Sequence, residues 1–268
     1  MKVIYIDYAI IWMKFIDKYK SPNFNKRKKG TFLNYIILHY TAMKNYKEAL
    51  NHLCDKNNKV SSHFLINKSG DIFYLVNIMS RAWHAGISNW RKVSDINSES
   101  IGIEIDNSGY LYDFENYTTK QIDSLIKLLK YISYNYAIKK HNILGHSDIS
   151  PYRKIDPGEK FPWIKLKRKN LSFLPKKLSQ NKATQINKYL DNKLAIKNRK
   201  QKSLYMLKKI GYDIEPAKNN YTKYSMLIKA YQMHFRQSLI SGKLDLETFQ
   251  LIQSHFNEIL TWANFSNN

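Results

Sequence analysis

The chain has 268 residues, of which 43% are hydrophobic and 14% aromatic, so it can bury the core of one large domain or two smaller ones. Its single cysteine excludes a disulfide framework and a cysteine-based zinc site. The net charge of +23 favours an acidic partner, but biased codon usage also produces a composition this rich in Lys, Asn and Ile, so the charge alone does not indicate function.

The N-terminus, MKVIYIDYAIIWMKFIDKYK, contains an apolar run that Asp7 interrupts and Lys14 ends. This run is too short to span a bilayer, and it lacks the small-residue cleavage site of a signal peptide. We therefore expect residues 1–30 to form an N-terminal extension without a transmembrane span. A segment that touches a membrane surface is the alternative.

Residues 31–168 combine short apolar runs with helical patterns and hold most of the glycines. Strands are predicted at 35–38, 64–66, 72–76 and 101–105, and helices at 46–54 and from a possible capping box at Thr118 and Gln121 to about residue 132. In the last of these strands the isoleucines share one face, and Glu104 lies on the other. Strands that alternate with helices predict an α/β domain, a central mixed β-sheet flanked by helices.

The chain after residue 165 has a different composition. Residues 165–200 contain twelve Lys or Arg and one Asp, which indicates a solvated basic linker over 169–202 with some helix near 186–194. Helical patches follow at 204–210, 225–235 and 246–260, separated by glycines. We expect residues 203–268 to form a small three-helix domain.

Three possible metal ligands lie at strand ends or in the loop GHSDISPYRKIDPG at 145–158. His39 ends an apolar strand, His146 follows another apolar stretch, and Asp156 precedes a Pro-Gly pair. A catalytic zinc needs three such nitrogen or oxygen ligands and one open position. Because the ligands are far apart in sequence, two structural histidines and a turn aspartate remain the alternative.

Two further residues have side chains suited to hydrolysis. Glu104 interrupts an isoleucine strand, where an apolar setting would raise its proton affinity and suit it to general-base catalysis. Lys154 lies two residues before Asp156, on the same side of an extended loop, where a cation could stabilise an oxyanion. For each, an ordinary solvated side chain is the alternative.

Five motifs in the same order resemble those of the type 2 N-acetylmuramoyl-L-alanine amidases of the AmpD and AmiD kind, relatives of the peptidoglycan recognition proteins. They are LHYTA at 38–42, SSHFLINKSGDIFYLV at 61–76, RAWHAG at 81–86, IGIEIDN at 101–107 and the loop at 145–158. The resemblance implies one Zn²⁺ per chain, held by His39, His146 and Asp156. It also implies that Glu104 activates water and that Lys154 stabilises the tetrahedral intermediate.

The same resemblance suggests residues near the substrate. His84 matches a groove residue, Asn107 and Arg153 could contact the stem peptide, and His63 fits a packed position. The C-terminal helical patches are similar to the three-helix peptidoglycan-binding domain, but residues 216–220 replace its glycine-rich turn. This departure puts glycan binding in doubt more than the helical fold, and a purely structural appendage remains the alternative.

The expected function is hydrolysis of the amide between N-acetylmuramic acid, or its 1,6-anhydro form, and L-alanine in cell-wall turnover or recycling. The expected partners are peptidoglycan or muropeptides and not nucleic acid, and the chain is expected to be a monomer. A recognition protein that binds peptidoglycan without cutting it is the alternative. The substrate favours the cell envelope, whereas the missing signal peptide is compatible with a cytoplasmic recycling role.

Overall fold

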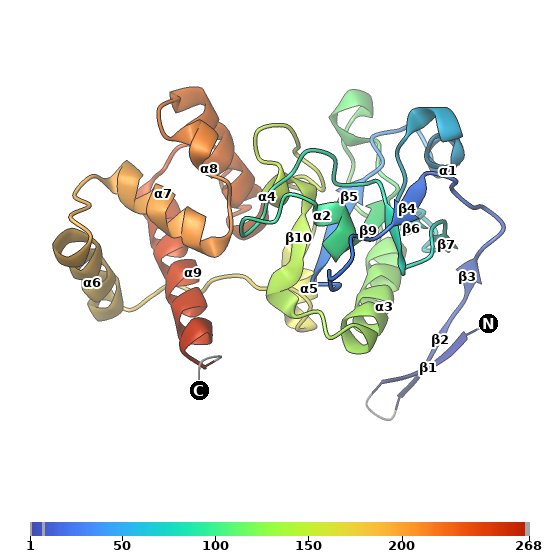
Figure 1. The fold of residues 1–268 in the computed structure, drawn as a ribbon, viewed down its shortest axis with the longest axis horizontal. Helices are drawn as coiled ribbons and strands as arrows, with labels where there is room; N and C mark the ends of the chain where they lie inside the picture. The colour runs from blue at the N-terminus through green and yellow to red at the C-terminus, as the bar shows by residue number, and fades with distance from the viewer. Residues whose placement is uncertain (1, 7–8, 266–268) are drawn as a thin grey trace. The chain divides into compact units, whose positions relative to one another are not determined.

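The structure, a computed structural model, describes residues 2–6 and 9–265 (Figure 1). Two units share the chain, and their segments alternate along it. The first contains the described residues up to Ser88, together with Asp95–His146 and Ile155–Phe173. The second contains Asn89–Ser94, Ser147–Lys154 and the described residues from Leu174 onward. Two short segments of the predicted catalytic region therefore pack with the C-terminal helices.

A six-stranded mixed sheet is the centre of the first unit. In spatial order its strands are β10 (Ile143–Gly145), β5 (Tyr35–Tyr40), β9 (Ser100–Ile105), β6 (Phe64–Ile66), β7 (Ile72–Tyr74) and β3 (Phe15–Ile16). The four strands from β10 to β6 are parallel, β6 and β7 form an antiparallel hairpin, and β3 is parallel to β7. The predicted α/β class, a mixed sheet with helices, is confirmed.

The central strands are apolar because both faces of this part of the sheet are covered. Ile36, Ile37 and Leu38 in β5 have no exposed surface, and neither have the isoleucines of β9. The predicted hairpin turns at Gly70, whose φ of +86° is a left-handed conformation that favours glycine.

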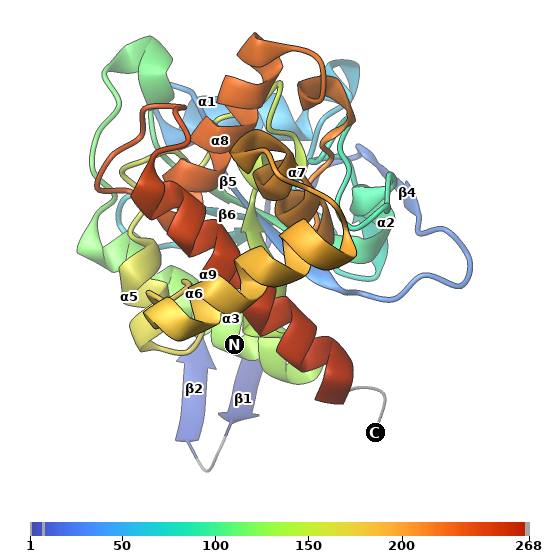
Figure 2. The ribbon, with the colours of Figure 1, turned by 90° about the vertical axis from the view of Figure 1, so that its left-hand side faces the viewer.

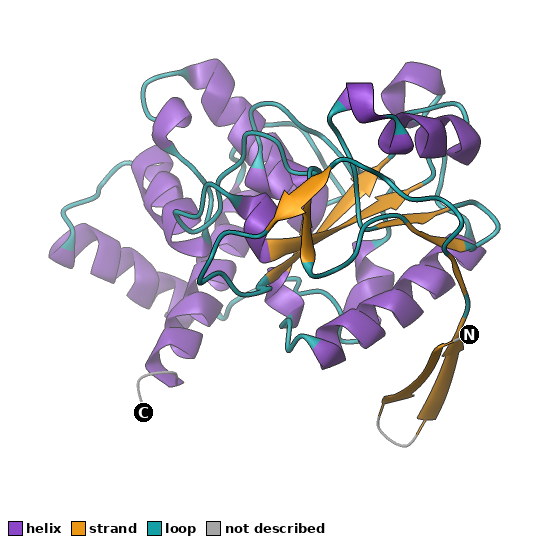
Figure 3. Cartoon of the chain, turned by 45° about the vertical axis from the view of Figure 1, so that its right-hand side comes forward, coloured by secondary structure: helices purple, strands orange, loops and turns teal. Residues whose placement is uncertain are grey.

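Helices cover both faces of the sheet (Figure 3). Helix α1 (Tyr46–Cys54) begins at Asn45, whose side chain accepts two backbone N–H bonds, and it packs on Leu65 and Phe73. Helix α3 (Thr119–Asn135) begins with the predicted capping box of Thr118 and Gln121. Shorter helices and 3₁₀ turns connect the strands: η1 (Lys56–Asn58), α2 (Ile96–Glu99), η2 (Gly109–Tyr112), η3 (Lys140–Asn142), α4 (His146–Ile149) and α5 (Trp163–Arg168).

The N-terminal segment contains strands that the sequence did not predict: β1 (Lys2–Ile6), β2 (Ala9–Met13) and β4 (Phe24–Lys26), which pairs with β8 (Ser80–Ala82). Ser21 and Asn23 are buried and donate to backbone carbonyls of residues 53, 55 and 60. The Arg27 guanidinium donates to the carbonyls of Ile78, Asn97, Ser98 and Ser100. Residues 15–27 are therefore built into the first unit.

The second unit is helical. Its elements are α6 (Gln180–Lys188), the π-helical turn η4 (Tyr189–Lys193), α7 (Arg199–Ile210), η5 (Glu215–Ala217), α8 (Tyr221–Phe235) and α9 (Leu246–Phe265). Helix α9 packs against α6 and α7 (Figure 2). The three predicted C-terminal helices are present, and each is longer than its apolar pattern indicated. Within the described residues, no helix is both long enough and apolar enough for a membrane crossing.

Candidate metal centre and active site

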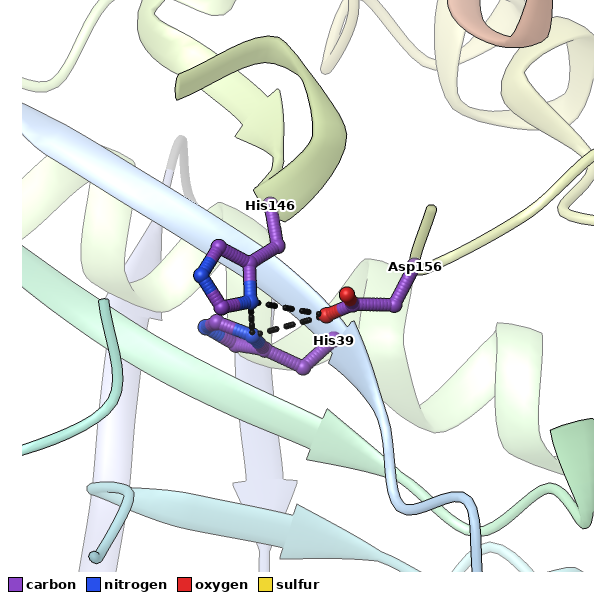
Figure 4. A group of neighbouring side chains, drawn as sticks. All are labelled: His39, His146 and Asp156. Atoms are coloured by element: carbon purple, nitrogen blue, oxygen red, sulfur yellow. Dashed lines mark hydrogen bonds and ion pairs between the residues drawn. The ribbon is translucent and has the colours of Figure 1, made fainter. Parts of the chain in front are cut away.

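His39, His146 and Asp156 lie together (Figure 4). The two histidines come from the carboxyl ends of neighbouring parallel strands, and Asp156 comes from the loop after α4. Leu38 in β5 is paired with Gly145, the last residue of β10, so His39, the next residue of β5, and His146, the first residue of α4, emerge side by side. Their Nδ1 atoms are 3.0 Å apart, and each is 3.0 Å from Asp156 Oδ2. All three side chains are buried.

In each histidine, the Nε2 atom points away from the cluster, and its hydrogen bond determines whether Nδ1 carries a proton or a lone pair. His146 Nε2 is 3.0 Å from the carbonyl oxygen of Ala85, which can only accept, so Nε2 carries the proton. His146 Nδ1 then presents a lone pair to the centre. His39 Nε2 is 3.1 Å from His84 Nδ1, so this ring also has a hydrogen-bond partner behind it.

This donor set fits one metal ion. Ligand atoms around tetrahedral zinc, at about 2.0–2.1 Å from it, are about 3.3 Å apart, close to the observed separations. Burial alone would raise the pKa of Asp156, but positive charge on the imidazoles of His146 and His39 outweighs it and holds that pKa well below its ordinary value; a metal ion held between their Nδ1 lone pairs would supply that positive charge in their place. The carboxylate is therefore ionised and ready to bind a cation.

Glu104 lies beside the cluster because of strand register. It is paired with His39 across the parallel strands β9 and β5, so the two side chains leave the same face of the sheet about 4.8 Å apart along the hydrogen-bonding direction. The residue is half-buried, and its Oε2 is shielded from solvent.

Burial, together with the negative charges of Asp156 and Glu104, raises the pKa of the Tyr117 phenol well above its usual value.

The structure places two of the expected substrate residues in the interior. His84 is only 6% exposed, and its ring contacts His39 instead of facing solvent. Asn107 has no exposed surface; its amide donates to the Glu115 carbonyl and accepts from the Gly109 N–H. Asn107 therefore orders the 108–115 loop, and its contact with a stem peptide stays a prediction.

Arg153 and Lys154 belong to the segment 147–154, which packs in the second unit. Their backbone N–H groups both bond to the Ser150 carbonyl, which forms a tight turn. Arg153 is exposed and Lys154 half-buried. His63, in contrast, is fully buried in the first unit, as a packed residue would be.

The buried His63 makes the stability of the protein depend on pH. Its Nδ1 accepts from the Gly102 N–H and its Nε2 donates to the Ser80 carbonyl. Burial, reinforced by the Arg27 charge, lowers the pKa of His63 to about 3. Because the unfolded chain binds this proton near pH 6.5, stability is lost as the pH falls from about 6.5 toward 3, by up to about 1.4 kcal/mol per pH unit.

We expect His63→Asn to remove this contribution, so that its stability depends less steeply on pH between 6.5 and 4 than that of the wild type. Urea unfolding of the metal-free proteins across this range measures the difference. His52→Asn, at a partly exposed position in α1, is the matched control. Parallel stability curves for wild type and His63→Asn would contradict the interpretation.

Sequence reasoning missed the residues that support the ligands. They are the Ala85 carbonyl, Asn97, whose Oδ1 accepts the backbone N–H groups of His84 and Ala85, and Ser100, whose hydroxyl contacts His84. One signal was available for part of this set. In β9 the residues alternating with the isoleucines are Ser100, Gly102 and Glu104, which is not the pattern of an ordinary solvated strand face.

The fold and the cluster together define an α/β protein with a candidate mononuclear metal centre of the type that hydrolases use. Comparisons identify the family. The sequence model of the N-acetylmuramoyl-L-alanine amidases matches residues 29–159. N-acetylmuramoyl-L-alanine amidase AmiD of Escherichia coli K12 is 37% identical over 226 residues, which cover 80% of this chain and 78% of AmiD. The 1,6-anhydro-N-acetylmuramyl-L-alanine amidase AmpD of Haemophilus influenzae is 34% identical over 162 residues, covering 54% of this chain and 86% of AmpD.

The similarity extends to solved structures. The complex of E. coli AmiD with the substrate anhydro-N-acetylmuramic acid-L-Ala-D-γ-Glu-L-Lys has a TM-score of 0.71 at 32% identity and covers 87% of this chain and 93% of AmiD. The chain belongs to the N-acetylmuramoyl-L-alanine amidase family. The resemblance found in its motifs is thereby confirmed.

Proposed function

We propose that this protein is a zinc-dependent amidase that hydrolyses the bond between the lactyl group of N-acetylmuramic acid, including its 1,6-anhydro form, and L-alanine of the stem peptide. The main support is the convergence of two imidazole nitrogens and one carboxylate oxygen at 3.0 Å in a chain of this family. The AmiD complex, whose ligand contains this linkage, supports the choice of substrate.

His39, His146 and Asp156 would hold the zinc ion. When bound, zinc supplies Lewis acidity that polarises a carbonyl and makes a water molecule easier to deprotonate. Glu104, paired with His39 across the sheet, takes a proton from the attacking water as the new C–O bond forms on the lactyl carbonyl. It then passes that proton to the alanine nitrogen as the C–N bond breaks, which leaves a lactyl carboxylate and a free amine.

Lys154 and Arg153 have supporting roles in this proposal. The Lys154 ammonium, two residues from the ligand Asp156, stabilises the oxyanion of the tetrahedral intermediate, a contact whose loss typically costs about 3 kcal/mol of barrier. The exposed Arg153 guanidinium suits the carboxylates of a stem peptide, which planar, paired N–H donors bind well.

The test is mass spectrometry of products from defined reducing-end and 1,6-anhydro muropeptides, with and without a chelator. We expect each substrate to separate into a sugar with a free lactyl carboxylate and an intact stem peptide. Chelation should stop the reaction, and added Zn²⁺ should restore it. Binding without any cleavage would instead identify a recognition protein, and cleavage by protein stripped of metal would refute the zinc mechanism.

A further inference from the structure

The His84 side chain links the metal cluster to the interior of the first unit. Its Nδ1 is 3.1 Å from His39 Nε2, and its Nε2 is 3.2 Å from the Ser100 hydroxyl oxygen. The rings of His84 and His39 are nearly perpendicular, at 79°. His84 therefore contacts the nitrogen of His39 that points away from the cluster.

The direction of these hydrogen bonds follows from the Ser100 hydroxyl, the last group in the series from His39 through His84. The Ser100 hydroxyl donates its only hydrogen to the Ile96 carbonyl at 2.6 Å, so toward His84 it can only accept. His84 Nε2 then carries the proton and Nδ1 a lone pair. That lone pair accepts from His39 Nε2–H, which leaves His39 Nδ1 with its lone pair directed at His146 and Asp156.

Both metal-binding histidines are oriented from the same short segment. His84 accepts from His39, and the carbonyl of the next residue, Ala85, accepts from His146. The backbone N–H groups of His84 and Ala85 both donate to Asn97 Oδ1, at 3.1 and 2.8 Å, which anchors the segment.

Gly102 makes room for the His84 ring. A Cβ atom at this position would lie 2.4 Å from His84 Cγ, much closer than real Cβ contacts allow. Ser100, Gly102 and Glu104 alternate on one face of β9. This face therefore provides, in order, an acceptor for His84, space for its ring and the partner of His39.

We propose that His84 is a positioning residue that sets the tautomer of His39, so that His39 Nδ1 is ready to bind the metal before the ion arrives. This inference rests on the metal site of the proposed function but not on the amidase reaction. Outer groups of this kind typically contribute 10- to 100-fold to metal affinity. The role differs from substrate contact, which the burial of His84 disfavours.

Two substitutions separate hydrogen bonding from packing. His84→Phe keeps a ring of similar size but removes the acceptor, whereas His84→Asn loses volume but places an amide oxygen the same number of bonds from the backbone as Nδ1. We expect His84→Phe to weaken Zn²⁺ binding about 10- to 100-fold in chelator competition, and His84→Asn to recover most of that loss. A packing role predicts the opposite order.

A direct readout is the tautomer of His39 in the metal-free protein, from long-range ¹H–¹⁵N NMR. We expect the Nε2–H form in the wild type and a mixture in His84→Phe. If His84→Phe does not fold, as thermal unfolding of the metal-free protein would show, the milder Ser100→Ala should produce a smaller fall in zinc affinity.

Wild-type zinc affinity in His84→Phe, an equal loss in both His84 variants, or an Nδ1–H tautomer of His39 in the wild type would overturn the proposal. The wild type and the His84 variants could show the expected order of zinc affinity while the wild type cleaves no muropeptide. That result would refute the proposed reaction and leave the role of His84 intact.

Discussion

Glu104→Gln should bind zinc as the wild type does and lose about 10²- to 10⁴-fold in kcat, the usual contribution of a positioned general base. The side chain keeps its size and its place opposite His39, but the amide cannot accept a proton from water. His39, His146 and Asp156 are unchanged, so metal affinity has no reason to fall. Single-turnover hydrolysis of a defined muropeptide and zinc competition measure the two quantities separately.

Glu99→Gln is the matched control. Glu99 ends α2 and accepts a hydrogen bond from Asn34, outside the proposed catalytic group. It should retain full turnover. Normal hydrolysis by Glu104→Gln would remove Glu104 from the mechanism, and a large loss of zinc would mean that it supports the metal site instead of activating water.

His234→Phe should destabilise the protein by about 3 kcal/mol, because it removes a partner of a buried carboxylate. Asp148 has no exposed surface, and it accepts hydrogen bonds from His234 Nδ1 and the Tyr212 hydroxyl, both at 2.6 Å. These three residues all belong to the second unit. Urea unfolding of the metal-free variant measures the loss, with His52→Phe as a control at a partly exposed helix position.

The same substitution should also weaken zinc binding. The segment 147–154 that contains Asp148 begins directly after the proposed ligand His146 and ends two residues before the proposed ligand Asp156. Loosening it leaves both ligands on a less ordered chain, so part of the binding energy is used to reorder them. An unfolding free energy within about 0.5 kcal/mol of the wild type would show that the Asp148–His234 pair contributes little.

Local patterns predicted the two longest helices and four of the central strands of the first unit. The helix at 46–54, the capping box at Thr118, and the hairpin around Gly70 were all visible in the sequence, because each depends on residues within a few positions of one another. Strands β3 and β10 were not predicted. Each has only two or three residues, and each exists because a distant strand, β7 or β5, provides its partner.

The candidate site was also predicted in part from the sequence and decided in part by distant contacts. The motifs indicated His39, His146, Asp156 and Glu104, and the structure brings the first three together and pairs Glu104 with His39. The motifs suggested a substrate role for His84, but its burial and its bond to His39 were not visible in them. A sequence motif identifies a residue type at a position, whereas exposure depends on what the rest of the chain packs around it.

Residue chemistry and short-range periodicity, which are properties of the chain alone, were enough to predict an α/β fold and three C-terminal helices, and the resemblance of its motifs to the amidase family indicated a set of donors suited to one metal ion. Tertiary structure decided which nitrogen of each histidine faces the metal centre, and it assigned residues 147–154 to the helical second unit. The physical reason is that ring tautomers and loop order depend on hydrogen-bond partners such as Ala85, Ser100 and His234, which lie tens of residues away in the sequence and become neighbours only on folding.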